Sequence, residues 1–524
     1  MWRAACIFWI VFFPFSLFAQ PPAQEDVTAQ SLEQTALATW RDYDYATAER
    51  LYRQSLAKDP SFGDAHAGLI RSLLDEKQPA AAQQAANAAL QAAPQSAAVQ
   101  AADGDLLLRQ GNVEDAEAAY RRAVAIDDHL ARGWFGLGRV AQINSYYRTA
   151  KHSILKAHDL DPLDPEINEF WASLLPRAER RKAVEHMVDH PGHMTPERLN
   201  VLQSRLAWLI VLGNSTAWKL VSTTETAKLK LDHIFTSAHM DDNMGRIGAP
   251  PRVAAVAVHV QLNNKKTVSL LLDTGANGIV LHRNPAEKAG IKPVFDIAAK
   301  GIGDDKAASG YLGWANDVKI GPIEFQNVPV TVLSSSFAEG TDGLIGIDVF
   351  EHFLISLDIK NSELDLDPLP VLPAENRDDD GTSDRYVAPE MKDYYPVLHM
   401  GPHILVSTSI DRKTPGLFFL DTGAFDSQVD SDYVSKDKLK PAPGLVVRGL
   451  SGRVAEVYFA ENVRIQFGRF VQENFRMVAI SMDKLSEGEG IGLTGILGFP
   501  LLSQFRISID YRDGLVNFDY HEKR

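Results

Sequence analysis

Two short segments, LLLDTGA at residues 270–276 and FFLDTGA at residues 418–424, decide the fold of this chain. In each, three apolar residues lead into Asp-Thr-Gly-Ala, the pattern of a buried strand that delivers a carboxylate at its end. Glycine after the aspartate allows close backbone approach, and threonine can hydrogen-bond to neighbouring backbone. The sequence therefore predicts two equivalent turns, one carrying Asp273 and the other Asp421.

The similarity between the two halves extends beyond these segments. Gly-Leu-Ile-Gly at 343–346 answers Gly-Ile-Leu-Gly at 495–498, at similar distances after the two aspartates. FLISLD at 353–358 then aligns with FRISID at 505–510 without a gap. An internal duplication is the simplest explanation. It predicts two similar β-lobes that pack about a pseudo-twofold axis.

Packing about such an axis makes Asp273 and Asp421 neighbours although they lie 148 positions apart. Two carboxylates about 3 Å apart do not both ionise readily, so they share a proton and one titrates well above the other. The ionised partner can take a proton from a water molecule while the protonated partner polarises a substrate carbonyl. This chemistry hydrolyses an amide without a cofactor or metal, and we expect neither in this chain.

The paired segments and their spacing resemble those of aspartic peptidases. More narrowly, they are similar to the retropepsin-like, Gag-polyprotein-type aspartyl proteases of bacteria, with two lobes fused as in pepsin-like enzymes. The resemblance covers roughly residues 225–524. It implies that Asp273 and Asp421 form the catalytic dyad and that Thr274 and Thr422 brace the two lobes across the axis.

The same resemblance implies two flap hairpins over the cleft, at residues 300–314 and 448–459. Tyr311 and Tyr458 lie in these segments and are candidates for closing the flaps. Asp358 and Asp510 occupy equivalent positions in the two halves, and we interpret them as turn residues at strand ends.

The N-terminal half has a period of 34 residues, which indicates repeated helix pairs. Three columns share this step: Ala48, Ala82, Ala116 and Ala150; Ser55, Ala89, Ala123 and Ala157; Pro60, Pro94, Asp128 and Pro162. Small residues on one helix face let two antiparallel helices approach closely, and Pro or Asp ends the second helix of each pair.

This period resembles that of the tetratricopeptide repeat. Trp134, Leu137 and Gly138 show the family's W-x2-L-G order best, whereas Ala36 and Ile70 replace the glycine in the first two copies. The resemblance implies a solenoid whose concave surface binds a protein partner or the substrate. A generic alanine-rich helical bundle is the alternative interpretation.

The first 19 residues have the layout of a secretory signal peptide: Arg3, an apolar run and the small residue Ala19. A run of ~15 apolar residues is shorter than the ~20 that a membrane-spanning helix needs. The sequence therefore predicts a secreted or periplasmic protein, without stable membrane insertion after cleavage. Cleavage would remove Cys6, the only cysteine. The formal net charge of −15 argues against nucleic acid as a partner.

His186 and His190 are four residues apart and form a His-x-x-Asp-His pattern with Asp189, which suggests a metal site. However, Pro191 and Gly192 end the helix at once and no clear third ligand follows. We therefore prefer a solvated helix end.

The expected fold is multidomain, α plus all-β: an N-terminal α-solenoid followed by a bilobal β-barrel domain with pseudo-twofold symmetry. The expected parts are a signal peptide (1–19), helical repeats (29–165), further helices and a linker (166–224), a first protease lobe (225–370), an acidic linker (371–387) and a second lobe (388–524). The expected function is an aspartic endopeptidase acting on polypeptides. The alternative is a catalytically inactive envelope scaffold whose repeats bind protein partners.

Overall fold

The computed structural model describes residues 27–235, 252–299, 302–303, 308–334, 340–411, 413, 415–449 and 452–521. The predicted signal segment, residues 1–19, lies outside this part of the chain. Within it, no helix is both long and apolar enough to cross a bilayer.

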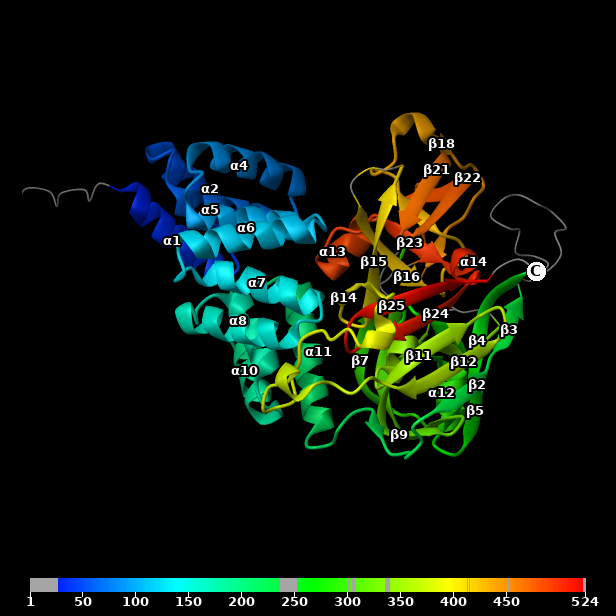
Figure 1. Cartoon of the computed structure of the whole chain (residues 1–524). Coiled ribbons are helices and arrows are strands. Elements are labelled where there is room, and N and C mark those ends of the chain that lie inside the picture. The colour runs from blue at the N-terminus through cyan, green and yellow to red at the C-terminus, as the bar shows by residue number, and fades with distance from the viewer. Residues whose placement is uncertain are drawn as a thin grey trace, which may run out of the picture.

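The first part of the chain folds into antiparallel helix pairs (Figure 1). The pairs are α1 (Ala29–Arg41) with α2 (Tyr45–Lys58), α3 (Gly63–Asp75) with α4 (Pro79–Ala92), α5 (Ala97–Arg109) with α6 (Val113–Ile126), and α7 (Ala131–Ile143) with α8 (Tyr147–Leu160). Three more helices continue the array: α9 (Pro165–Leu174), α10 (Arg177–Asp189) and α11 (Pro196–Leu212). The predicted helical array is therefore confirmed.

The small residues of the two in-phase columns explain the close approach within each pair. All eight, from Ala48 to Ala157, are buried. Gly104 and Tyr120 show how tight the packing is, because a Cβ added at Gly104 would lie 2.7 Å from the Tyr120 ring. Tyr120 is itself fully buried and its hydroxyl donates to Asp105 at 2.8 Å. The 34-residue period of the sequence therefore reflects the repeated close contacts between paired helices.

The first lobe is built on the strands β4 (Val253–Leu262), β5 (Lys266–Asp273), β6 (Ile279–His282), β8 (Ala308–Ile320), β9 (Ile323–Leu333) and β10 (Gly343–Gly346). They hydrogen-bond in the order β4-β5-β10-β6-β9-β8, and β8 returns to β4. The path is therefore cyclic. Strands β1 (Lys219–Leu220), β3 (Asp232–Phe235) and β7 (Pro293–Ala299) extend it, and α12 (Arg283–Ala289) follows β6.

The second lobe repeats this arrangement with β15 (His403–Ile410), β16 (Gly416–Asp421), β17 (Gln428–Asp430), β21 (Tyr458–Phe467), β22 (Phe470–Ile480) and β23 (Gly495–Gly498). Their order is β15-β16-β23-β17-β22-β21, and β21 returns to β15. Strand for strand, this is the path of the first lobe. Strands β14 (Leu398–Met400) and β18 (Leu439–Pro441) flank it, with α13 (Asp483–Glu489) and α14 (Phe499–Leu502) before and after β23.

A third sheet joins the lobes. Its order is β13 (Tyr395–Pro396), β25 (Leu515–Tyr520), β24 (Phe505–Asp510), β11 (Phe353–Asp358), β12 (Glu363–Pro368) and β2 (Ala227–Lys230). At its centre Ser356 of β11 lies opposite its equivalent, Ser508 of β24, with 3.3 Å between the hydroxyl oxygens. An antiparallel pair of equivalent residues is symmetric about its midpoint, so the pseudo-twofold axis passes here. The predicted bilobal arrangement is confirmed.

The helical array packs against the second lobe (Figure 1). Leu108, Tyr120 and Val140 of the array share one apolar core with Leu405 and Leu417 of the lobe. Polar contacts add to it, since Lys77 forms a 2.8 Å ion pair with Glu487.

The acidic segment between the lobes also contacts the array. Lys151 of α8 pairs with Asp380 at 2.6 Å, and the Asp384 carboxylate accepts from the backbone and hydroxyl of Thr149. The array is therefore fixed relative to the lobes by an apolar core and by these charges.

We predict that Gly104→Ala destabilises the protein by about 1–3 kcal/mol, because the added methyl overlaps the buried Tyr120 ring. Denaturant unfolding measures the change. Gly488→Ala in α13 is the matched control, because a Cβ there meets nothing within 4 Å. Equal stability of the two variants would contradict the tight packing of α5 on α6.

Candidate active site

The two aspartates end equivalent strands. Asp273 is the last residue of β5 and pairs with Gly346 of β10, and Asp421 is the last residue of β16 and pairs with Gly498 of β23. Both strand pairs are parallel. The apolar residues before each aspartate are buried in the lobe cores, so each strand is anchored and its end reaches the axis between the lobes.

Thr274 and Thr422 lock the two turns together with four reciprocal hydrogen bonds. The N–H of Thr274 donates to Oγ1 of Thr422 at 3.0 Å, and the N–H of Thr422 donates to Oγ1 of Thr274 at 2.9 Å. Each hydroxyl in turn donates to a carbonyl of the other lobe: Thr274 to Leu420 at 2.6 Å, and Thr422 to Leu272 at 2.9 Å. Both threonines are buried. The bracing role expected for them is confirmed.

The carboxylates face each other across this junction. A Cβ at Gly423 would lie 2.4 Å from Oδ2 of Asp273, and one at Gly275 would lie 3.0 Å from Oδ1 of Asp421. Each carboxylate thus packs against the glycine that follows the other aspartate. The two side chains predicted to meet are brought together, and glycine is required at both positions because a side chain would occupy the space of a carboxylate.

Backbone N–H groups orient both carboxylates. Oδ1 of Asp273 accepts from Gly275 at 2.8 Å. Oδ1 of Asp421 accepts from Gly423 at 2.8 Å and from Ala424 at 3.0 Å. The side chains are therefore held by the same turns that carry them.

The pair is electrostatically asymmetric. Burial, and then the charge of Asp421, hold the pKa of Asp273 well above its ordinary range. Burial also raises the pKa of Asp421, but hydrogen bonds from Asp273, Gly423 and Ala424 oppose that rise. These effects favour the shared proton on Asp273 over Asp421.

Asp348 is a third carboxyl at this site, and the sequence did not reveal it. Both its oxygens lie 3.1 Å from the N–H of Gly278, at the end of the Asp273 turn. Burial raises the pKa of Asp348 to about 6. Comparison of the two halves could not find this residue, because Pro500 occupies the equivalent position in the second lobe.

Two hairpins occur in the segments expected to form flaps. Strands β7 and β8 form one, and the short strands β19 (Arg448–Gly449) and β20 (Gly452–Arg453) form the other. Residues 300–301, 304–307 and 450–451 lie outside the described part of the chain. The hairpins meet, since a Cβ at Gly449 would lie 2.4 Å from the Ile302 carbonyl oxygen.

Neither candidate flap tyrosine lies at a hairpin tip. Tyr311 is buried in the core of the first lobe, because it falls on the inward side of the long strand β8, and the role suggested for it is wrong. Tyr458 starts β21, and its hydroxyl donates to Glu456 at 3.0 Å.

The carboxyls of Asp358 and Asp510 accept backbone N–H groups from Asn361 and Asp513, three residues further on. They are turn residues, as interpreted from the sequence.

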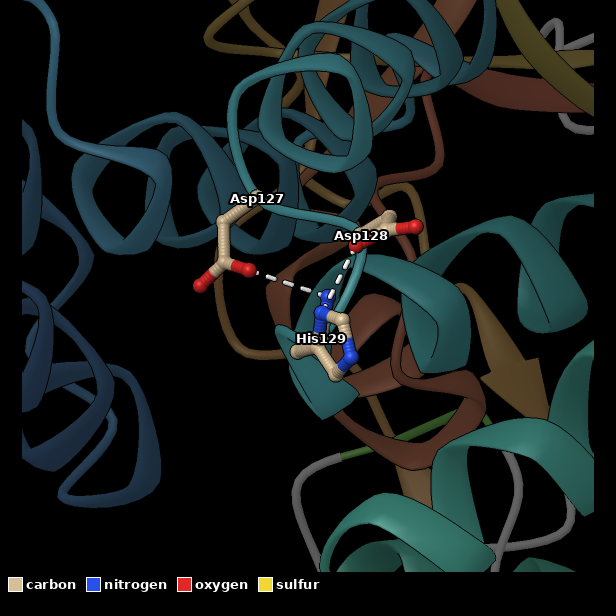
Figure 2. A group of neighbouring side chains, drawn as sticks. All are labelled: Asp127, Asp128 and His129. Carbon is tan, nitrogen blue, oxygen red and sulfur yellow. Dashed lines mark hydrogen bonds and ion pairs between the residues drawn. The ribbon is translucent and has the colours of Figure 1, made fainter.

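His186 of α10 and His190, which follows the helix, form no metal site with a third ligand in the described part of the chain. Their rings stack at 4.4 Å and both are exposed, which agrees with a solvated helix end. One cluster of possible ligands does occur among the described residues, at Asp127, Asp128 and His129 (Figure 2). All three are exposed and already contact one another, at 2.9 Å and 2.7 Å. We assign no metal to this turn.

Comparison with known families agrees with the two-part architecture. An aspartyl protease family model matches residues 258–349 and 406–501, which include both aspartate turns. Tetratricopeptide repeat models match residues 40–106 and 101–142. No curated protein sequence matches the chain.

Several solved structures are also similar. An aspartic proteinase from Irpex lacteus is 14% identical, covers 56% of this chain and 97% of its own, and has a TM-score of 0.35. PilF of Pseudomonas aeruginosa is 24% identical, with coverages of 35% and 84% and a TM-score of 0.24. A thermophilic tetratricopeptide repeat protein of Thermus thermophilus is 18% identical, with coverages of 35% and 100% and a TM-score of 0.27.

We predict that Thr422→Val lowers the free energy of unfolding by about 1–3 kcal/mol, because it leaves the buried N–H of Thr274 without its acceptor. Thr422→Ser keeps the hydroxyl and serves as the control. Chemical denaturation compares the variants, and a valine variant as stable as the serine variant would rule out the reciprocal bonds.

Proposed function

We propose that this chain, which carries an aspartyl-protease domain behind tetratricopeptide repeats, is an aspartic endopeptidase that uses Asp273 and Asp421. The observation that supports this proposal most directly is that the two carboxylates lie together across the Thr274–Thr422 junction. Each packs against the glycine of the other lobe's Asp-Thr-Gly turn. A pair held in this way has one base and one acid at the same place, as amide hydrolysis requires.

The proposed reaction starts with one proton on the pair. Asp421 takes a proton from the attacking water, and Asp273 donates its proton to the substrate carbonyl oxygen, so a neutral tetrahedral diol forms. Asp421 then passes the proton to the leaving amine while Asp273 recovers its proton from a diol hydroxyl. The C–N bond breaks, an acid and an amine leave, and the pair regains its starting state.

The geometry supports this sequence because the carboxylates need little reorganisation. Backbone N–H groups hold one oxygen of each aspartate, and the threonine bonds fix the distance between the turns. A preorganised pair lowers the barrier more than a mobile one.

The repeats are proposed to bind the substrate or a protein partner, and the apolar N-terminal segment supports export to the periplasm or the exterior. The repeats share a core with the second lobe, so a polypeptide bound to the array is held near the catalytic lobes.

We predict that Asp273→Asn and Asp421→Asn each abolish peptide cleavage while the protein stays folded. A panel of unstructured peptides, assayed by mass spectrometry between pH ~3 and 8, measures cleavage. Asp358→Asn is the control, because this carboxyl belongs to a turn in the joining sheet. Cleavage by either dyad variant at the wild-type rate would remove the pair from the mechanism, and an inactive wild type across this range would favour a scaffold.

Asp273→Asn should also be at least as stable as wild type at neutral pH. The folded-state pKa of Asp273 is raised, so its contribution to stability is present below its unfolded pKa near 3.8 and is lost as pH rises through the folded value. Asparagine cannot ionise and avoids this loss. Thermal unfolding at pH 4 and pH 7 measures it, and a variant that loses stability only at pH 7 would contradict the assignment.

A further inference from the structure

The helical array contains a groove of about 1090 Å³, lined by the inner helices α1, α3 and α7 and by the turns that precede α3, α7 and α9. This volume exceeds that of pockets for drug-sized ligands, about 300–1,000 Å³. The groove is therefore large enough for several residues of a polypeptide.

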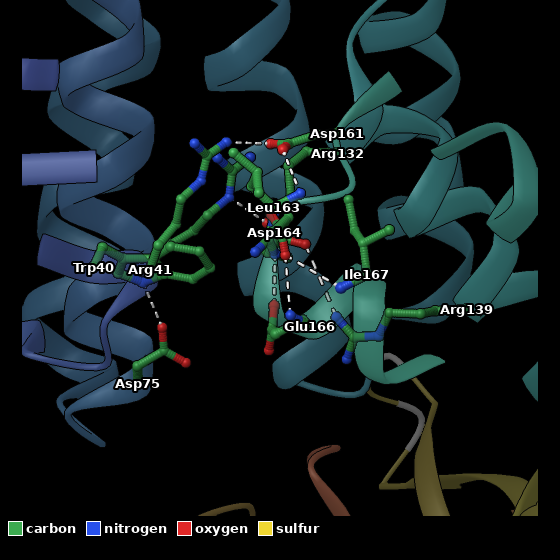
Figure 3. A network of polar contacts seen from close by, with 12 residues as sticks. Trp40, Arg41, Asp75, Arg132, Arg139, Asp161, Leu163, Asp164, Glu166 and Ile167 are labelled. Atoms are coloured by element: carbon green, nitrogen blue, oxygen red, sulfur yellow. Dashed lines mark hydrogen bonds and ion pairs between the residues drawn. The ribbon is translucent and has the colours of Figure 1, made fainter. Parts of the chain in front are cut away.

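Beside this groove, the first helix pair of the array contacts the turn that follows α8 (Figure 3). Arg41, at the end of α1, forms a 2.6 Å ion pair with Asp161, which is 120 residues further along the chain. The guanidinium of Arg132 lies 4.8 Å from the centre of the Trp40 ring. These contacts between the first helix pair and the region from α7 to the turn after α8 form one wall of the groove.

The arginines of the groove are already neutralised by carboxylates of the array. Arg132 is bound by Asp164 and Glu166, and Arg71 by Asp105 at 2.9 Å. Together with the Arg41–Asp161 pair, these contacts satisfy the positive charge of every arginine that lines the groove.

Four lining carboxylates then remain without a salt bridge to a basic side chain in the described part of the chain: Glu33, Asp59, Asp64 and Asp127. Glu33 lies on α1 and Asp64 on α3, and both line the groove. Burial, and then the charge of Asp64, raise the pKa of Glu33. The groove therefore has a surplus of negative charge, which favours a cation over an anion.

The guanidiniums of these arginines are largely enclosed by the array. Nε of Arg41, Nη2 of Arg71 and Nη2 of Arg132 are buried and have no hydrogen-bond partner among the described residues. Arg132 is only 6% exposed. Because these guanidiniums are enclosed and already paired with carboxylates, they add no binding site for a second anion in the groove.

We propose that the groove binds an extended polypeptide segment that carries lysine or arginine side chains. The cationic head group lies at Glu33 and Asp64, and its alkyl stem packs on the lining residues Leu37 and Phe62. This inference specifies the partner class for the binding role proposed for the repeats.

Fluorescence anisotropy with the full-length Asp273→Asn variant tests the proposal without cleavage. The probes are three labelled peptides of equal length in which lysine, glutamine or glutamate alternates with alanine. We expect the lysine peptide to bind most tightly and to lose affinity as salt is raised. Glu33→Gln with Asp64→Asn should weaken its binding about 3- to 10-fold, as expected for the loss of one or two partly exposed ion pairs.

Glu114→Gln with Asp115→Asn is the matched control, because it removes the same charge from exposed positions of α6 outside the groove. Its affinity for the lysine peptide should equal that of the parent. Equal binding of the three peptides, no binding of any, tighter binding of the glutamate peptide, or an equal effect of the two double variants would overturn the proposal. Because no outcome depends on turnover, the result is independent of whether the dyad is active.

Discussion

The reciprocal hydrogen bonds between Thr274 and Thr422 are the constraint on which the rest of the site depends. Each threonine hydroxyl accepts a hydrogen bond from the other threonine's backbone N–H, which burial removes from water. The polar groups of each turn are therefore paired only when the other turn is in place. The bonds set the separation of the strand ends, and that separation places Asp273 against Gly423 and Asp421 against Gly275. Two unpaired lobes would leave buried donors and two isolated carboxyls.

The two lobes are more alike in the order of their strands than in the charged groups around their aspartates. The two lobes have the same strand order, and equivalent serines meet on the axis. Yet Asp348 supports the Asp273 turn, while Pro500 stands at the equivalent position in the other lobe. The pKa values of the two aspartates also differ, because hydrogen bonds from Asp273, Gly423 and Ala424 oppose the effect of burial on Asp421, whereas burial and the charge of Asp421 raise the pKa of Asp273. Unequal pKa values let one carboxyl act as acid and the other as base.

Much of this arrangement follows from local sequence patterns. The repeated Asp-Thr-Gly-Ala segments predicted the equivalent strand ends, and the alanine columns predicted the helix pairs, because both patterns record which residues must be small or buried. The flap role expected for Tyr311 was wrong because the sequence shows that the residue lies in a hairpin segment, but not that it lies on a long, half-buried strand. The Arg41–Asp161 pair joins residues 120 positions apart, and no periodicity encodes a contact between single charges at that distance.

The most direct measurement of the central claim is a high-resolution crystal structure near pH 5 without a bound ligand. The account predicts one ordered water within hydrogen-bond distance, about 2.5–3.2 Å, of carboxylate oxygens from both Asp273 and Asp421. Carboxylates too far apart for a single water to contact both, or one of them turned into a lobe core, would contradict it.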